Sequence, residues 1–237
     1  MGLIRRLFFF ILLLAGAYTF GQQQAQFSQY IVNEFLVNPA LSGSEDFIDI
    51  KAGYRSQWAG FGDFAPKTFY LSGHTTLGKS HFKRTKKNDY HNWHGAGGLF
   101  QSDNTGLASS TSGYINYSYN FQITPGTGYN RNHKDGVRMS VGTFLGFNQF
   151  SIDGSQLDPE ETDDDAITTN LEQTTTLPDG SIGAMLYYQD QFFIGVSVFN
   201  IFGSRIRFSG LGQDVNSDIN TTGRLARHYF ISGAYKA

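Results

Sequence analysis

The sequence of 237 residues has no cysteine, only 5 prolines and almost no net charge. The lack of cysteine excludes a disulfide scaffold and thiolate metal sites. A formal charge of −2 at pH 7 gives no basic surface of the kind that binds nucleic acid, so no nucleic-acid partner is expected. Long hydrophobic runs are also scarce. The apolar stretch Leu7–Leu14 is far shorter than the roughly 20 residues of a membrane-spanning helix.

The short apolar stretch has the surroundings of an export signal. Arg5 and Arg6 precede it, and Thr19 and Gly21 place small residues at the two positions that a signal peptidase reads. Cleavage after Gly21 is predicted, which gives a signal peptide of residues 1–21. No cysteine follows the apolar stretch, so a lipoprotein anchor is not expected.

Glycine and aromatic residues are abundant. The chain has 28 glycines, 22 phenylalanines and 13 tyrosines, yet its mean hydropathy is only −0.30. A helical membrane protein would be much more apolar. A transmembrane β-barrel alternates lipid-facing and lumen-facing residues and carries aromatic girdles, so it combines many aromatics with an unremarkable mean hydropathy.

The two-residue period of a β-strand recurs along most of the chain. In the clearest case, Val137–Asn148, apolar residues such as Val141 and Phe147 alternate with polar residues and glycine. Eight segments have this character: residues 47–55, 68–75, 93–102, 113–122, 137–148, 182–188, 192–198 and 224–235. We therefore predict an all-β fold, an antiparallel transmembrane β-barrel with at least eight strands, which need not complete the barrel. An antiparallel sandwich with one wet face is the alternative.

Glycine also falls inside the predicted strands, for example at Gly142, Gly183 and Gly195. Such glycines would weaken a soluble sandwich, whereas in a barrel they permit curvature and tight packing inside. Short and long connections alternate, as expected of an outer-membrane barrel with short turns on one side and long loops on the other. The acidic stretch Ser151–Gly180 is predicted as a long external loop, and Gln189–Gln191 as a hairpin turn.

Two groups of residues carry candidate chemistry. The cluster Asp158–Asp165 supplies carboxylates of the kind that hold Ca²⁺, but its spacing does not match an EF-hand loop, and a solvated loop is the simpler interpretation. Ser72 and His74 share one strand face, as do His228 and Ser232, and membrane-barrel lipases build Ser/His sites in this way. Nucleophilic catalysis also needs an orienting group and an oxyanion site, so polar lining of the lumen is preferred. No catalytic residue, metal or cofactor is predicted.

An ordered set of residues behind the export signal looks like a family signature. It comprises Gln26, Phe27, Gln29, Tyr30, Asn38, Pro39, Ala40, Gly43, Tyr54, Arg55, Gln57 and Trp58. These residues resemble the start of the PorP/SprF family, outer-membrane components of the type IX secretion and gliding machinery of Bacteroidota. The resemblance covers nearly the whole mature chain. Because family members are generally longer, the chain looks like a C-terminally truncated member.

The resemblance implies a division of the chain and a role. The signal peptide (1–21) is followed by an irregular segment with the family motif (22–46) and by the barrel (47–237). The implied role is non-enzymatic and accessory, in type IX protein secretion, gliding motility or adhesin display. The implied partners are outer-membrane lipid and either periplasmic ring or motor components or a secreted surface adhesin.

The segment Gln26–Gly43 has two possible roles under this resemblance. It either plugs the lumen or presents a periplasmic docking surface, and we expect it to contact a periplasmic component. Within it, Pro39 is expected to hold Asn38 in an extended conformation and so to shape an irregular lead-in to the first strand. From the residues alone two other functions stay open: a small outer-membrane pore or transport barrel, and a membrane-barrel hydrolase.

Overall fold

The computed structural model describes residues 32–45, 47–58, 60, 62, 65–77, 92–124, 136–153, 172–189, 191–206 and 223–235. The signal peptide, the motif residues Gln26, Phe27, Gln29 and Tyr30, and the cluster Asp158–Asp165 lie outside these residues. In the part of the chain that is described, no helix has the length and apolar character needed to span a bilayer.

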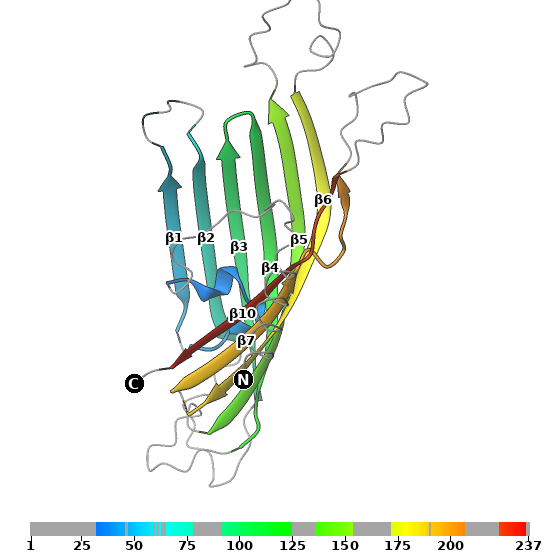
Figure 1. The fold of residues 1–237 in the computed structure, drawn as a ribbon. Helices are drawn as coiled ribbons and strands as arrows, with labels where there is room; N and C mark the ends of the chain where they lie inside the picture. The colour runs from blue at the N-terminus through cyan, green and yellow to red at the C-terminus, as the bar shows by residue number, and fades with distance from the viewer. Residues whose placement is uncertain are drawn as a thin grey trace, which may run out of the picture.

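Eight antiparallel strands form one sheet in the order β1-β2-β3-β4-β5-β6-β7-β10, and the sheet curls into a half-barrel (Figure 1). The strands are β1 (Asp49–Ser56), β2 (Lys67–Leu77), β3 (Asn92–Thr105), β4 (Ala108–Gln122), β5 (Val137–Asp153), β6 (Glu172–Tyr188), β7 (Phe192–Phe199) and β10 (His228–Tyr235). A separate pair, β8 (Arg205–Ile206) and β9 (Gly223–Arg224), lies between β7 and β10 in the chain. The predicted antiparallel, barrel-like all-β fold is confirmed.

All eight predicted strands are present, and several are longer than predicted. β5 runs to Asp153 and β6 begins at Glu172, so the predicted loop Ser151–Gly180 is wrong at both of its ends. The run Thr174–Thr176, which pairs with β5, explains the error. Threonine is β-branched and favours strands, but a run of it gives no apolar alternation to detect.

The predicted strand 224–235 is interrupted in the structure. Leu225 donates its N–H to the carbonyl of Ser204 (3.0 Å), and Asn200 Nδ2 donates to the carbonyl of Ala226 (2.9 Å). These bonds tie the chain between β9 and β10 to the residues that follow β7. Only from His228 onward does it pair with β7 itself.

Short and long connections do not separate to opposite ends of this sheet. The tight turn Gly106–Leu107 between β3 and β4 lies at the same end as the connection 154–171 between β5 and β6. The predicted hairpin at Gln189–Gln191 is confirmed by the bond from Gln191 N to the Tyr188 carbonyl (3.1 Å). It lies at the same end as the connection 78–91, so the expected sorting by length is wrong here.

The two faces of the sheet differ in chemistry, as β5 illustrates. Val141, Leu145 and Phe147 are between 39% and 49% exposed on the convex face, whereas Arg138 and Ser140 are buried on the concave face. This confirms the alternation predicted for Val137–Asn148.

Because paired residues on neighbouring strands lie on the same face, the apolar convex face and the polar concave face continue across the whole sheet. At convex positions level with Val137–Phe147, the described residues include no Asp, Glu, Lys or Arg. The concave face is lined by small polar residues that are nevertheless buried, among them Ser72, Asn116, Ser118, Asn120, Ser140 and Ser197. Something other than solvent therefore covers them.

Candidate functional site

Residues 33–44, which we call the internal segment, cover the concave face (Figure 1). The segment contains two short 3-10 turns, η2 (Glu34–Leu36) and η3 (Pro39–Leu41), and η3 packs against β4, β5 and β6. Asn38 precedes η3 in an extended conformation (φ −145°, ψ 111°), and its Oδ1 accepts from Ala40 N (3.0 Å). This confirms the expected effect of Pro39, and it makes Asn38 the N-cap of the turn.

The concave face holds the internal segment mainly through main-chain carbonyls of the segment. Seven side-chain donors from β3, β4, β5 and β7 reach six carbonyls. They are Ser197 to Val37 (2.5 Å), Asn116 to Pro39 (2.9 Å), Ser140 to Ala40 (2.5 Å), Ser118 and Asn120 to Ser42 (2.6 and 3.2 Å), Trp93 to Gly43 (2.7 Å) and Arg138 to Ser44 (3.4 Å). These seven buried donors of the sheet thus find their acceptors in the segment, as buried donors need to.

Two side chains of the segment enter the sheet more deeply. The ring of Phe35 is fully buried, with its centroid 4.8 Å from that of His74 and 5.1 Å from that of Phe144. Asn38 Nδ2 donates to the carbonyls of Ala184 (3.3 Å) and Val196 (3.4 Å), which are partners across β6 and β7. Aromatic packing and polar bonding therefore fix the segment at two points.

Glycines of the concave face make room for the segment. An added Cβ would come within 3.0 Å of Ser42, Pro39 or Asn38 at each of four strand glycines: Gly95, Gly142, Gly183 and Gly195. The strand glycines predicted to permit tight packing inside the barrel thus have a specific neighbour. Gly43 has a backbone conformation (φ +72°) that an L side chain rarely adopts, and a Cβ added there would come within 3.0 Å of Gly95 Cα. Glycine is therefore the residue that suits this position.

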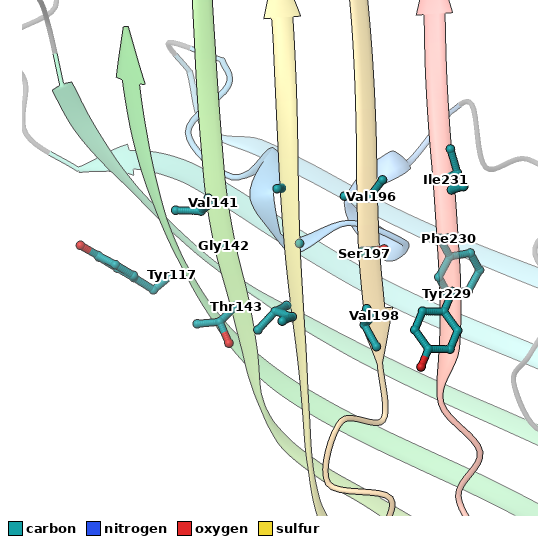
Figure 2. Close-up of a pocket in the computed structure, with 13 residues that line it drawn as sticks. Tyr117, Val141, Gly142, Thr143, Val196, Ser197, Val198, Tyr229, Phe230 and Ile231 are labelled. Atoms are coloured by element: carbon teal, nitrogen blue, oxygen red, sulfur yellow. The ribbon is translucent and has the colours of Figure 1, made fainter. Parts of the chain in front are cut away.

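The convex face carries an apolar groove of about 690 Å³ on the other side of the same strands. Tyr117, Val141, Ile182, Val198, Tyr229 and Ile231 are among the residues that line it. Figure 2 shows these strands with the internal segment behind them. Ala184 and Val196 line the groove while their carbonyls bind Asn38 on the inside.

Comparison with family models assigns the chain. The model described as "Type IX secretion system membrane protein PorP/SprF" matches residues 19–237. The chain belongs to the PorP/SprF family. No curated protein and no solved structure matches it. Family membership makes the chain a membrane component of type IX secretion, as the resemblance implied.

The apolar convex face of this PorP/SprF chain has the dimensions of a lipid-facing band. On β5 the band extends from Val137 to Phe147. With a rise of about 3.3 Å per residue and a tilt of about 40°, this corresponds to a height of roughly 25 Å, equal to the ~25 Å band of transmembrane barrels. Beyond it, convex positions become polar, for example Gln149 and Ser151.

The structure separates the two halves of the PorP/SprF motif. Asn38, Pro39, Ala40 and Gly43 lie in the internal segment, all of them buried. The other half lies at the far end of β1 and just beyond it. There Tyr54 is exposed on the convex face, the Arg55 guanidinium lies against the side-chain amide of Gln57, and Trp58 is 68% exposed with φ +52°. The motif is therefore no single site.

The candidate Ser/His pairs have structural surroundings. Ser72 Oγ accepts from Asn33 Nδ2 (2.8 Å), and His74 packs on Phe35 with its Nε2 3.5 Å from an Asp49 carboxylate oxygen. Among the described residues no serine hydroxyl hydrogen-bonds to His74, and no group of three or more His, Asp or Glu is placed to hold a metal ion.

The residues that hold the internal segment were recognised from sequence only as a polar strand face. The available signal was the run Asn116, Ser118 and Asn120, three small hydrogen-bonding side chains at alternate positions of one strand. Water in an open lumen would serve such residues equally well. The sequence could not show that a peptide segment replaces that water.

Proposed function

We propose that this chain is a non-enzymatic outer-membrane β-barrel that acts as an accessory component of type IX secretion, in protein export, gliding motility or adhesin display. Family membership supports the secretion role. The uncharged convex band, about as tall as an outer membrane's apolar layer, supports the location. His74 has no hydrogen bond from Ser72 or any other described serine, so this pair lacks the nucleophile–base contact that hydrolysis needs, which favours a structural role.

The observation that carries the proposal is the occupation of the concave face by the internal segment. A diffusion pore needs a water-filled path, whereas here buried serines and asparagines bind peptide carbonyls. The same observation changes the expected docking surface. Phe35 is fully buried, so residues 33–43 plug the half-barrel and leave little surface for a periplasmic partner.

Partner contacts must then come from the ends of the sheet, since the band between them faces lipid. Gln189, after β6, lies at the end where β1 begins, and Trp58, after β1, lies at the other end. We take the first end to be periplasmic, because the export signal leads the chain into β1 from that side.

A photo-crosslinking amino acid at each position in the native host tests the proposal. The probe at Gln189 should capture a periplasmic ring or motor component, and the probe at Trp58 should not. Capture from Trp58 alone would invert the orientation. If neither probe captures any type IX component, the pore function becomes the better explanation. Measurement of single-channel conductance would then test it.

A further inference from the structure

The internal segment is bound on the concave face of the sheet and is not one of its paired strands. Its backbone–backbone hydrogen bonds run within the segment, for example from Leu36 N to Asn33 O (3.3 Å) and from Ser44 N to Leu41 O (3.0 Å). The ladder from β1 to β10 is continuous without it. The sheet therefore does not use the segment to complete its own pairing, and the concave face is a preformed surface.

Most contacts with this surface are independent of the sequence of the occupant. The sheet supplies side-chain donors, and the segment supplies main-chain carbonyls such as those of Pro39 and Gly43. Any polypeptide that follows the same path presents the same acceptors. The glycines beneath the path, such as Gly142 and Gly183, require only that the backbone approach closely.

Asn33 and Ser42 of the occupant each hydrogen-bond to a serine of the sheet, but the two side chains that enter the sheet most deeply are Phe35 and Asn38. Phe35 fills a buried aromatic site against His74 and Phe144. Three residues later, Asn38 bonds to two carbonyls of the sheet and caps the turn that follows. The site therefore selects the pattern Phe-x-x-Asn-Pro followed by a small residue.

We propose that the concave face is a polypeptide-binding site and that the internal segment is its tethered occupant, which a segment of a second polypeptide with this pattern can replace. The occupant carries one acidic residue, Glu34, has an extended and 3-10 conformation, and is bound mainly by its carbonyls and by the side chains of Phe35 and Asn38. The site does not depend on which type IX component the barrel contacts, so failure of this proposal would leave the accessory role untouched.

A synthetic fluorescent peptide with the sequence of residues 32–45 tests the site, using the full mature chain in detergent. The chain has no cysteine, so a single engineered pair can lock its own segment in place. Ser42 Oγ donates to Ser118 Oγ (2.7 Å), which makes Ser42→Cys with Ser118→Cys the natural lock. The same variant in its reduced form is the matched control, and gel mobility with and without heating checks that both forms are folded.

The peptide should bind the reduced chain saturably and the oxidised chain at least about tenfold more weakly. A peptide with Asn38→Ala should bind about tenfold more weakly than the natural peptide, because it loses two hydrogen bonds to the sheet. Conversely, Asn38→Ala in the chain should strengthen binding of the natural peptide about tenfold by weakening its competitor. Equal binding to locked and unlocked chains, equal binding of the two peptides, or no binding even to the Asn38→Ala chain would each overturn the proposal.

Discussion

Gly183 of β6 leaves the space that the side chain of Asn38 occupies. A Cβ at Gly183 would come within 3.0 Å of Asn38 Oδ1, and that oxygen also accepts the N–H of Ala40 (3.0 Å). The amide nitrogen of the same side chain donates to the carbonyls of Ala184 and Val196. Asn38 therefore cannot turn away from a larger neighbour without losing a hydrogen bond.

Replacement of Gly183 by Ala should destabilise the folded protein by about 1–3 kcal/mol, the usual cost of overpacking a tight interior. Gly73→Ala is the matched control, because its added Cβ meets only ordinary contacts, the nearest at 3.6 Å. Ala should be neutral or slightly favourable there, since glycine weakens a strand. Urea unfolding of both variants in detergent measures the difference. Equal midpoints would mean that the segment does not press on β6.

The two tryptophans provide a second matched pair. Trp93 is buried and donates to the Gly43 carbonyl (2.7 Å), whereas Trp58 is exposed. Trp93→Phe keeps an aromatic ring at this position but leaves the buried Gly43 carbonyl without its donor, which should cost about 1–3 kcal/mol. Trp58→Phe should change the free energy of unfolding by less than about 0.5 kcal/mol. The contrast disappears if the end of the internal segment is not docked.

Glu34 gives the internal segment a dependence on pH. Burial raises the pKa of its carboxyl from 4.5, and Lys51 opposes this only in part. The folded state therefore holds the proton more tightly than the unfolded state, so the contribution of Glu34 to stability is most favourable below pH 4.5 and becomes less favourable as pH rises through the raised pKa. Glu34→Gln should flatten this fall and stabilise the protein at pH 7.5, with little effect at pH 4. Thermal unfolding of both proteins at the two pH values tests the sign, and a Glu34→Gln protein that is less stable at pH 7.5 would contradict it.

Alternation of side chains was sufficient to predict the strands and their faces. Val141 and Phe147 alternate with Ser140 and Asn148. A two-residue period places the first pair on one face of the sheet and the second pair on the other. Where both faces are polar, as at Thr174–Thr176, the period vanishes and the start of β6 could not be found.

The contacts of the internal segment could not be predicted because they join residues far apart in sequence. Ser197 and Val37 are hydrogen-bonded although they lie 160 positions apart in the chain, and the sequence around either residue gives no sign of the other. The sequence did show strand glycines, and it gave two interpretations of Gln26–Gly43. The three-dimensional contacts, such as the closeness of Gly142 to Pro39 and the burial of Phe35, indicate which of the two applies to residues 33–43.

Export has its own test at the N-terminus. Arg5, Arg6 and the apolar stretch Leu7–Leu14 predict removal of residues 1–21. Intact-mass measurement on protein from the native envelope should find a chain that begins at Gln22. Retention of Met1–Gly21 on the folded protein would contradict both the signal and the outer-membrane location.

The lipid-facing band makes a prediction that distinguishes a membrane barrel from a soluble sandwich. Val141 lies on the convex face in the middle of the band, 39% exposed, and Val141→Arg should cost roughly 2–4 kcal/mol because a cation there is transferred into hydrocarbon. Ser140, its neighbour on the concave face, is no control, since it is buried against Ala40 (2.5 Å). Gln101 is the better choice, as it lies on the concave side of β3 beyond the internal segment and is only partly buried. Gln101→Arg should cost less than about 1 kcal/mol. Refolding into lipid vesicles, followed by gel mobility with and without heating, compares the two variants. Equal tolerance of arginine at both positions would mean that the convex face meets water, and the membrane assignment of this sheet would fail.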